Sequence, residues 1–236
     1  MDNEYLLEVS DIHTYIGQFH ILQGVTVRVP MGHIVALLGR NGAGKTMTLK
    51  SILGLTPPRR GRIVFDGREI HGNRSFDIAS MGIGFVPENR AVFRDLSVLE
   101  NLRIAERSKG DLARKEELIF TLFPDLKRLI KLPGANLSGG QQQMLAVARA
   151  LVPDNKLLLI DEPSEGLAPV LIEQMMEAIR HLSAETTVLL VEQNFVVASQ
   201  LASSYVIIEE GQSVDSGEMA DLINDPATIH RYLGAA

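Results

Sequence analysis

The chain has 236 residues, of which 45% are hydrophobic and 22% are charged, and its formal net charge is −6. This length is enough for one domain with an inserted lobe. The acidic balance argues against a protein that coats nucleic acid, so we expect no nucleic-acid partner. The chain has no cysteine, which excludes disulfides, thiolate metal sites and cysteine nucleophiles.

The amino-terminal residues M-D-N-E-Y lack the basic start and the apolar segment of a signal peptide. No apolar run in the sequence approaches the ~20 residues that a membrane-spanning helix needs. We therefore expect any role at a membrane to be peripheral.

Short apolar runs typical of β-strands alternate with helical patterns along much of the chain. The runs at 6–12 and 25–29 have one polar face, whereas 33–38 is continuously apolar, as expected of a strand buried on both sides. This last run leads into a glycine loop and a helix over about 44–54. Further strands are expected at 62–65, 83–86, 156–160, 187–191 and 205–209.

The character of the sequence changes between about 88 and 155, where helical patterns dominate and no buried strand is expected. Helices are predicted at 97–107, 111–122 and 139–151. The sequence therefore predicts one domain over 1–236. Its α/β core is expected at about 1–87 and 156–236, with a helical subdomain at about 88–155.

The segment G-R-N-G-A-G-K-T, residues 39–46, fits the pattern G-x-x-x-x-G-K-[ST] and lies between a predicted strand and a predicted helix. Its glycines let backbone N–H groups turn toward phosphate oxygens, and the helix N-terminus adds positive potential. Lys45 is expected to reach the β- and γ-phosphates, and Thr46 is expected to bind Mg²⁺. The nucleotide-binding residues predicted here are Gly39, Arg40, Asn41, Gly42, Ala43, Gly44, Lys45, Thr46 and Met47.

A second segment, K-L-L-L-I-D-E-P at 156–163, places two carboxylates at the end of an apolar strand. Ligands of open α/β sheets bind at this end of the strands. Successive side chains of a strand diverge, so the two carboxylates are expected to differ in role. Asp161 would hold Mg²⁺ through water, and Glu162 would accept a proton from the attacking water. Together the two segments predict a nucleoside triphosphatase.

The stretch A-N-L-S-G-G-Q-Q-Q-M, residues 135–144, predicts a helix start, because Ser138 and Gln141 have the capping-box spacing. Gly139 and Gly140 weaken this start by roughly 0.8–1 kcal/mol each relative to Ala. Within it, L-S-G-G-Q resembles the signature of ATP-binding cassette (ABC) ATPases. The resemblance implies that Ser138, Gly139, Gly140 and Gln141 close over an ATP held by a partner subunit, since bare glycines let backbone N–H groups approach a γ-phosphate.

The resemblance to ABC ATPases covers essentially the whole chain. It implies an α/β fold: a P-loop core with an antiparallel β flank and an inserted helical subdomain. It also implies that ATP and Mg²⁺ are the cofactors. One phosphate loop and one signature make half of a pair of sites, so a second ABC ATPase subunit is expected, with a heterodimer preferred and a homodimer also open.

Several positions depart from the usual ABC pattern. Glu88 stands where a glutamine that senses Mg²⁺ is usual, and Ala168 replaces an aspartate in the loop after the second carboxylate segment. Gln193 replaces the switch histidine, and we expect it to position the γ-phosphate, because its amide does not titrate near neutral pH. The adenine-stacking aromatic would fall at Ile16, with Tyr15 adjacent as the candidate to stack. Glu88 is expected to contact Mg²⁺, an attacking water or the membrane partner.

The segments V-P-E, S-E-G-L-A-P, L-V-E-Q-N and R-Y-L-G resemble the ATPase subunits of branched-chain amino acid importers. That resemblance implies two transmembrane permease subunits, a periplasmic binding protein as an indirect partner, and a peripheral place on the cytoplasmic face of the membrane. Segment 89–101 is expected to help form the docking surface, with Val92 and Phe93 as core residues instead being the alternative. Uptake of urea, short amides or other small polar solutes, a non-transport ABC ATPase and a non-hydrolysing regulatory module stay open.

Overall fold

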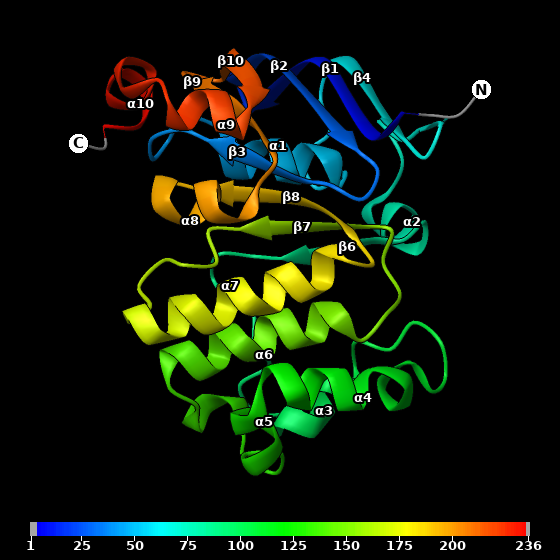
Figure 1. Ribbon diagram of the computed structural model, residues 1–236. Coiled ribbons are helices and arrows are strands. Elements are labelled where there is room, and N and C mark those ends of the chain that lie inside the picture. The colour runs from blue at the N-terminus through cyan, green and yellow to red at the C-terminus, as the bar shows by residue number, and fades with distance from the viewer. Residues whose placement is uncertain (1–3, 235–236) are drawn as a thin grey trace.

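Two β-sheets and a group of helices follow one another along the long axis of the molecule in Figure 1. The structure is a computed structural model, and it describes residues 4–234. No helix in that range is both long enough and apolar enough to cross a bilayer.

The smaller sheet is antiparallel and has the strand order β2-β1-β4-β5. Its strands are β1 (Tyr5–Ile16), β2 (Phe19–Pro30), β4 (Arg60–Phe65) and β5 (Arg68–Glu69). The first two extend well beyond the predicted 6–12 and 25–29 and form a hairpin that closes at the pair Ile16 and Phe19. The sequence pattern misses this extension because Thr14 is polar yet buried, where its hydroxyl shares a hydrogen bond of 2.9 Å with Ser51.

The larger sheet has the strand order β10-β9-β3-β8-β7-β6, in which all neighbours are parallel except β10 and β9. The carboxyl ends of β3, β7 and β8 therefore meet at one edge of the sheet. The strands are β3 (Ile34–Leu38), β6 (Ile83–Val86), β7 (Leu157–Asp161), β8 (Thr187–Glu192), β9 (Ser204–Glu209) and β10 (Gln212–Glu218).

An apolar core lies on each face of the larger sheet. Strand β3 contributes to both, because its side chains alternate: Ile34, Ala36 and Leu38 pack toward the helices, and Val35 and Leu37 pack toward the antiparallel sheet. All five are buried, as the continuous apolar run predicted.

The helices α3 to α6 lie between β6 and β7 in the sequence and form the lower part of Figure 1. Helix α6 has the predicted bounds, but α3 ends before the predicted residue 107. The chain turns there because the carboxylate of Asp111 accepts hydrogen bonds from the backbone N–H groups of Arg107 and Ser108. The helices are α3 (Val98–Arg103), α4 (Asp111–Leu122), α5 (Pro124–Arg128) and α6 (Gly139–Leu151).

The remaining helices accompany the strands of the core. They are α1 (Lys45–Ile52), α2 (Ser75–Ser80), α7 (Pro169–Ser183), α8 (Phe195–Leu201), α9 (Met219–Ile223) and α10 (Pro226–Leu233). With the two sheets and the helices between β6 and β7, they confirm the expected fold class, an α/β core with an antiparallel β flank and inserted helices.

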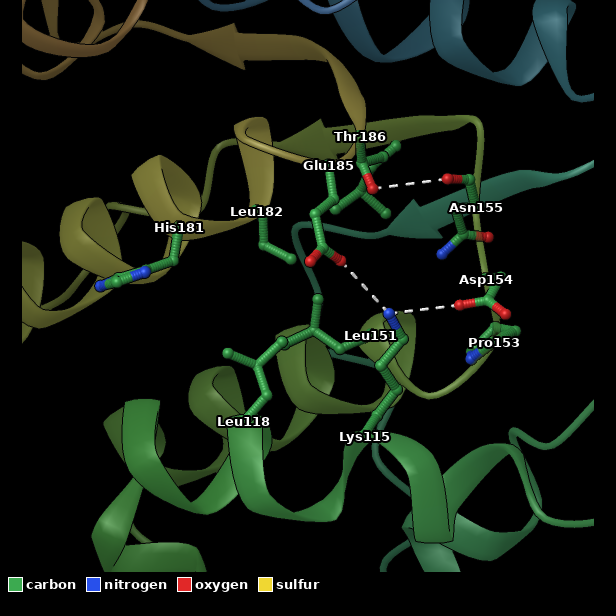
Figure 2. A pocket seen from close by; sticks show the side chains of 11 residues that line it. Lys115, Leu118, Leu151, Pro153, Asp154, Asn155, His181, Leu182, Glu185 and Thr186 are labelled. Carbon is green, nitrogen blue, oxygen red and sulfur yellow. Dashed lines mark hydrogen bonds and ion pairs between the residues drawn. The ribbon is translucent and has the colours of Figure 1, made fainter.

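Lys115 on α4 links the inserted helices to the core. Its ammonium lies 3.2 Å from Asp154 and 3.4 Å from Glu185, which follows α7, at the edge of a cavity of about 170 Å³ (Figure 2). Both carboxylates are largely exposed, with 69% and 71% of their side-chain surface accessible. Exposed pairs of this kind contribute only about 0.2–1 kcal/mol.

We expect Lys115→Met to lower the free energy of unfolding by no more than about 1 kcal/mol, and by less at high salt, because solvent screens both pairs. Urea unfolding at low and high salt measures this. Lys127→Met is the matched control, because Lys127 is exposed and makes no ion pair with the described residues. A much larger loss of stability, or a loss that does not depend on salt, would show that this contact holds the inserted helices firmly against the core.

Candidate nucleotide site

A cavity of about 400 Å³ opens at the carboxyl edge of the larger sheet. The loop after β3 leads through it into α1, and the residues that follow β7 form another of its walls. Its lining residues are Ile21, Asn41, Gly42, Gly44, Lys45, Thr46, Met47, Lys50, Glu88, Glu162 and Glu165.

The loop after β3 has a conformation that needs glycine. Gly39, Gly42 and Gly44 have φ angles of 150°, 80° and 114°, which side chains of L-residues rarely adopt. Gly39 has a further reason, because a Cβ on it would lie 2.3 Å from the carbonyl oxygen of Ile208. The loop is thus fixed by its own chain before any ligand binds.

The ammonium of Lys45 is buried at the centre of the site. It lies 3.0 Å from the carboxylate of Glu162 and donates hydrogen bonds to the carbonyl oxygens of Gly39 at 2.8 Å and Arg40 at 3.1 Å. Glu162 has φ of 44°, a left-handed conformation that is costly for a residue with a Cβ. A phosphate that reaches Lys45 must compete with this carboxylate.

Asp161 and Thr46 form a second contact, in which the Thr46 hydroxyl donates to the Asp161 carboxylate at 3.2 Å. Burial, together with the negative charges of Glu162 and Glu88, raises the pKa of Asp161 to about 6, against the lowering effect of the Thr46 hydrogen bond and the Lys45 charge. A cation beside Asp161 would relieve this burial of negative charge.

The two oxygen donors suit Mg²⁺, which is commonly held by one or two protein ligands together with substrate phosphates and water. In residues 4–234, no group of three or more His, Cys, Asp or Glu side chains converges as a ready-made metal site. The donor set therefore fits a metal that arrives with its nucleotide.

Glu88 and Glu165 add negative charge to the same cavity. Burial, together with the charges of Glu88 and Glu162, raises the pKa of Glu165. Glu165, Lys50 and Ile21 line the cavity but were not predicted from the sequence as site residues. Only Glu165 could have been predicted, because it lies three residues after Glu162 in the loop that follows β7.

Strand β8 ends in a residue that the sequence analysis also missed. Glu192 is only 1% exposed, and its carboxylate accepts hydrogen bonds from Ser164 and Asn194. Burial raises the pKa of Glu192 to about 7. Its neighbour Gln193 is exposed and does not line the cavity. The sequence feature that could have indicated Glu192 is its place as an ionisable residue at the end of the apolar run T-V-L-L-V-E.

A family profile described as ABC transporter matches residues 22–165, which contain the phosphate loop, the two carboxylates and the signature. The chain belongs to the ABC transporter family. It is an ATP-binding subunit of that family and an ATPase. The match ends at Glu165, so strand β8 and Glu192 lie outside the matched range, while Ser164, which donates to Glu192, lies within it.

This ABC subunit aligns with relatives over almost the whole length of both chains. The chain is 40% identical over 232 residues to the "High-affinity branched-chain amino acid transport ATP-binding protein BraG" of Pseudomonas aeruginosa, covering 97% of this chain and 100% of the relative. It is 33% identical to the "Probable branched-chain amino acid transport ATP-binding protein LivF" of Archaeoglobus fulgidus, covering 92% and 94%. A solved "ATP binding subunit of ABC transporter" has a TM-score of 0.81 and 30% identity, covering 93% of this chain and 92% of that one.

The ABC signature begins α6 with the predicted capping box. The Ser138 hydroxyl accepts from the Gln141 N–H at 3.3 Å, and the Gln141 side chain accepts from the Ser138 N–H at 2.9 Å. The Ser138 hydroxyl hydrogen has no role in these two bonds. Among the described residues that line the cavity, none comes from 138–141, so the signature does not reach the site of its own chain.

Contacts within this ABC chain also favour glycine at both signature positions, Gly139 and Gly140. A Cβ on Gly140 would lie 2.3 Å from Leu171 on α7, and a Cβ on Gly139 would lie 3.0 Å from the guanidinium of Arg90. Leu171 and Arg90 would have to shift to admit a larger residue at these positions. Packing within the chain thus favours small residues here, and access for a phosphate stays a prediction from the sequence.

Tyr15, which is expected to stack on adenine, does not line the cavity of this ABC subunit. The ring of Tyr15 stacks on His20 at 4.2 Å and carries the Arg59 guanidinium 4.5 Å from its centre, so stacking on adenine requires one of them to move. Ile21 is the hairpin residue that lines the cavity.

Arg40 points toward the C-terminal helix of the chain. Its guanidinium donates to the carbonyl oxygen of Arg231 on α10 at 3.3 Å. Arg40 and Ala43 line a separate cavity of about 240 Å³ and not the phosphate-loop cavity. Asn41 and Gly42 line both cavities, so the loop lies between them.

Proposed function

We propose that this chain is the ATP-hydrolysing subunit of an ABC importer for branched-chain, hydrophobic amino acids. One observation above all supports hydrolysis: Lys45 and Glu162 meet at 3.0 Å inside the phosphate-loop cavity. The cargo rests on the relative of 40% identity that is named for branched-chain amino acid transport, which is similar to this chain over its whole length.

ATP binding exchanges the partners of Lys45. A γ-phosphate oxygen replaces the Glu162 carboxylate, because phosphate brings more negative charge to the same ammonium. The released Glu162 then has a basic oxygen free, and it accepts a proton from the water that attacks the γ-phosphate. Gln193, which follows β8, would position the γ-phosphate, and this role requires its side chain to move toward the cavity.

Thr46 and Asp161 would hold Mg²⁺, with Glu88 as a further carboxylate at the same cavity. When bound, Mg²⁺ neutralises negative charge that develops on the transferred phosphoryl group. The raised pKa of Asp161 supports this assignment, since a buried carboxylate without a cation is costly.

A second ABC ATPase subunit completes the site from outside, because the signature of this chain lies away from its own cavity. Ser138, Gly139 and Gly140 would meet the γ-phosphate held by that partner, with Gln141 fixing the cap. We expect a heterodimer, with a homodimer as the alternative. Residues 88–155 would act as one subdomain that carries the signature, and the remaining residues as the core that carries the phosphate loop.

The membrane partner has a groove to dock into. A cavity of about 360 Å³ lies between the core and the inserted helices, and most of its lining residues are apolar or small. Its charged lining residues are Arg90, Arg107 and Arg149. No carboxylate is among the described residues that line it. The Arg149 guanidinium is half-buried, and its Nη1 donates to the carbonyl oxygen of Ala91 at 2.5 Å, while its Nε is buried without a hydrogen-bond partner. Burial lowers the pKa of this guanidinium. A half-buried guanidinium that pairs with no carboxylate of the described residues favours a partner segment that brings one.

The expected docking segment beside this groove divides between two environments. Phe93 is 44% exposed, and the Arg149 guanidinium lies 4.7 Å from the centre of its ring. Val92 is half-buried and packs against the core under the helices. We propose that Phe93 and Arg149 face a permease subunit on the cytoplasmic side of the membrane, with a periplasmic binding protein on the other side.

We expect Arg149→Met to reduce co-purification of the permease subunits about tenfold or more, because a carboxylate from the partner would lose its charged donor. The chain's own fold should survive, since Met keeps most of the apolar stem. Arg180→Met on the exposed face of α7 is the control, and it should co-purify as the unchanged chain does. Equal recovery of the permeases with both variants would exclude Arg149 from the docking surface.

Uptake of labelled leucine and labelled urea in the source cells tests the cargo, with the unchanged chain compared with Glu162→Gln. Loss of leucine uptake alone would support the branched-chain assignment. Loss of urea uptake alone would transfer the chain to an importer of that solute with the same chemistry. If neither changed, the importer assignment would fail and a non-transport ABC ATPase would become the better proposal.

A further inference from the structure

The catalytic glutamate of this site is held in a strained backbone conformation. Glu162 has φ of 44°, and such a conformation persists only where the surrounding structure fixes it. On its amino-terminal side the fixing contact is visible: the Glu162 N–H donates to the carbonyl oxygen of Val191 on β8 at 2.9 Å. On the carboxyl-terminal side, where the loop leaves the sheet, the Glu162 carbonyl oxygen accepts from the Glu165 N–H at 3.2 Å, a contact within the loop. A second contact, from outside the loop, would hold this side against the sheet.

Glu192, the next residue of β8, supplies that second contact. Its carboxylate accepts from the Ser164 N–H at 3.2 Å and from the Ser164 hydroxyl at 3.0 Å. It also accepts from the Asn194 N–H at 3.3 Å, on the far side of Gln193. Both Glu192 and Ser164 are buried. One carboxylate therefore ties the loop that carries Glu162 to the loop that carries Gln193.

We infer that Glu192 is a positioning residue, which together with Val191 clamps Glu162 from both sides and couples its position to that of Gln193. The inference rests on the proposed hydrolysis of ATP by Glu162. It assigns Glu192 no contact with the nucleotide. Among residues 4–234, the charged group that acts on Glu192 is the Glu162 carboxylate, whose repulsion adds to burial in raising the pKa of Glu192.

The first test is steady-state phosphate release as a function of MgATP concentration by this chain purified in complex with its proposed partner ATPase and permease subunits. Because small misplacements of a catalytic group are costly, Glu192→Ala should lower kcat about tenfold to a hundredfold and leave KM within about twofold. Glu192→Gln keeps one acceptor oxygen and should recover part of the rate. Ser164→Ala should reproduce part of the loss, and the double variant should lose little more, because both changes open the same clamp.

The matched control is Thr187→Val at the opposite end of β8. The buried Thr187 hydroxyl accepts a hydrogen bond from the Gly32 N–H at 2.8 Å, far along the strand from the site. This variant also loses a buried hydrogen bond, so it lowers stability without opening the clamp. Its kcat should match that of the unchanged chain.

Urea unfolding across pH gives a readout that does not depend on catalysis. A carboxyl whose pKa is raised to about 7 in the folded chain stabilises the fold while it is protonated, and this stabilisation is lost as pH rises through about 7. The urea midpoint of the unchanged chain should therefore fall relative to that of Glu192→Gln as pH rises from the ordinary glutamate value of 4.5 to about 7. In addition, the double variant of Glu192→Ala and Ser164→Ala should lose less stability than the sum of the two single losses.

The outcomes separate this inference from the proposed function. If Glu162→Gln abolishes phosphate release but Glu192→Ala leaves kcat unchanged, the clamp is overturned and the hydrolytic assignment stands. If the unchanged chain releases phosphate at the rate of Glu162→Gln, the hydrolytic assignment fails. Unfolding midpoints without coupling between the two positions would overturn the clamp in that case too.

Discussion

Glu162→Gln should lower the rate of ATP hydrolysis about a hundredfold to ten-thousandfold, the usual contribution of a general base, and leave MgATP binding intact. The amide has almost the shape of the carboxylate, and its oxygen can still accept from the Lys45 ammonium, which lies 3.0 Å away in the structure. It has no basic oxygen for the proton of the attacking water. Steady-state phosphate release and equilibrium binding of MgATP measure the two effects separately.

The affinity for MgATP should equal or exceed that of the unchanged chain. A phosphate must displace a charged carboxylate from Lys45 in the unchanged chain, whereas in the variant it displaces a neutral amide. Because hydrolysis separates the proposed pair of subunits, the ATP-bound pair should accumulate, and this is visible by size-exclusion chromatography with MgATP. Glu177→Gln makes the same chemical change on the exposed face of α7, where Glu177 pairs with Arg180, and should hydrolyse ATP normally.

A variant that still hydrolyses ATP within about tenfold of the unchanged chain would remove Glu162 from the role of base. Glu165 and Glu88, which line the same cavity, would then be the next candidates. A variant that fails to bind MgATP would instead show that the Lys45–Glu162 contact organises the loop itself.

Lys45→Met should weaken MgATP binding by about 2–5 kcal/mol, which corresponds to roughly 30-fold or more in Kd. The buried ammonium is the charged donor closest to Glu162, and its loss leaves the proposed phosphate site with carboxylates on several sides. Isothermal titration with MgATP measures the effect. Phosphate release should fall with it, because the γ-phosphate loses its charged contact.

Lys156→Met is the control for Lys45→Met, since Lys156 is exposed and pairs with Asp66 away from the cavity. Lys45→Arg tests whether charge alone suffices. The site around Lys45 is buried, and a larger guanidinium has to fit between Glu162 and the carbonyl oxygens of Gly39 and Arg40. Tight MgATP binding by Lys45→Met would contradict the assignment of this cavity to the triphosphate.

The sequence determined the local parts of this protein. The pattern of residues 39–46 predicted a glycine loop between a strand and a helix, and its three glycines do take positive φ angles. The spacing of Ser138 and Gln141 predicted a capping box that is present, and the apolar runs predicted the buried strands of the larger sheet. These features can be predicted from the sequence because they depend on residues only a few positions apart.

Contacts between distant segments were decided only by the tertiary structure. The length of the β1–β2 hairpin depends on Thr14 meeting Ser51, and the reasons for Gly139 and Gly140 include Arg90 and Leu171. No local pattern carries such information, because each contact joins residues that the fold alone brings together.

The same division holds within the site. The sequence pointed to Lys45, Thr46, Asp161 and Glu162 by motif, but the contact between Lys45 and Glu162 depends on β3 and β7 ending at the same edge of the sheet, on either side of β8. Glu192 closed an apolar strand and gave no sign that it binds Ser164, 28 positions earlier. Its role depends on β7 and β8 being neighbours in the sheet, and pairing of strands is a property of the whole fold.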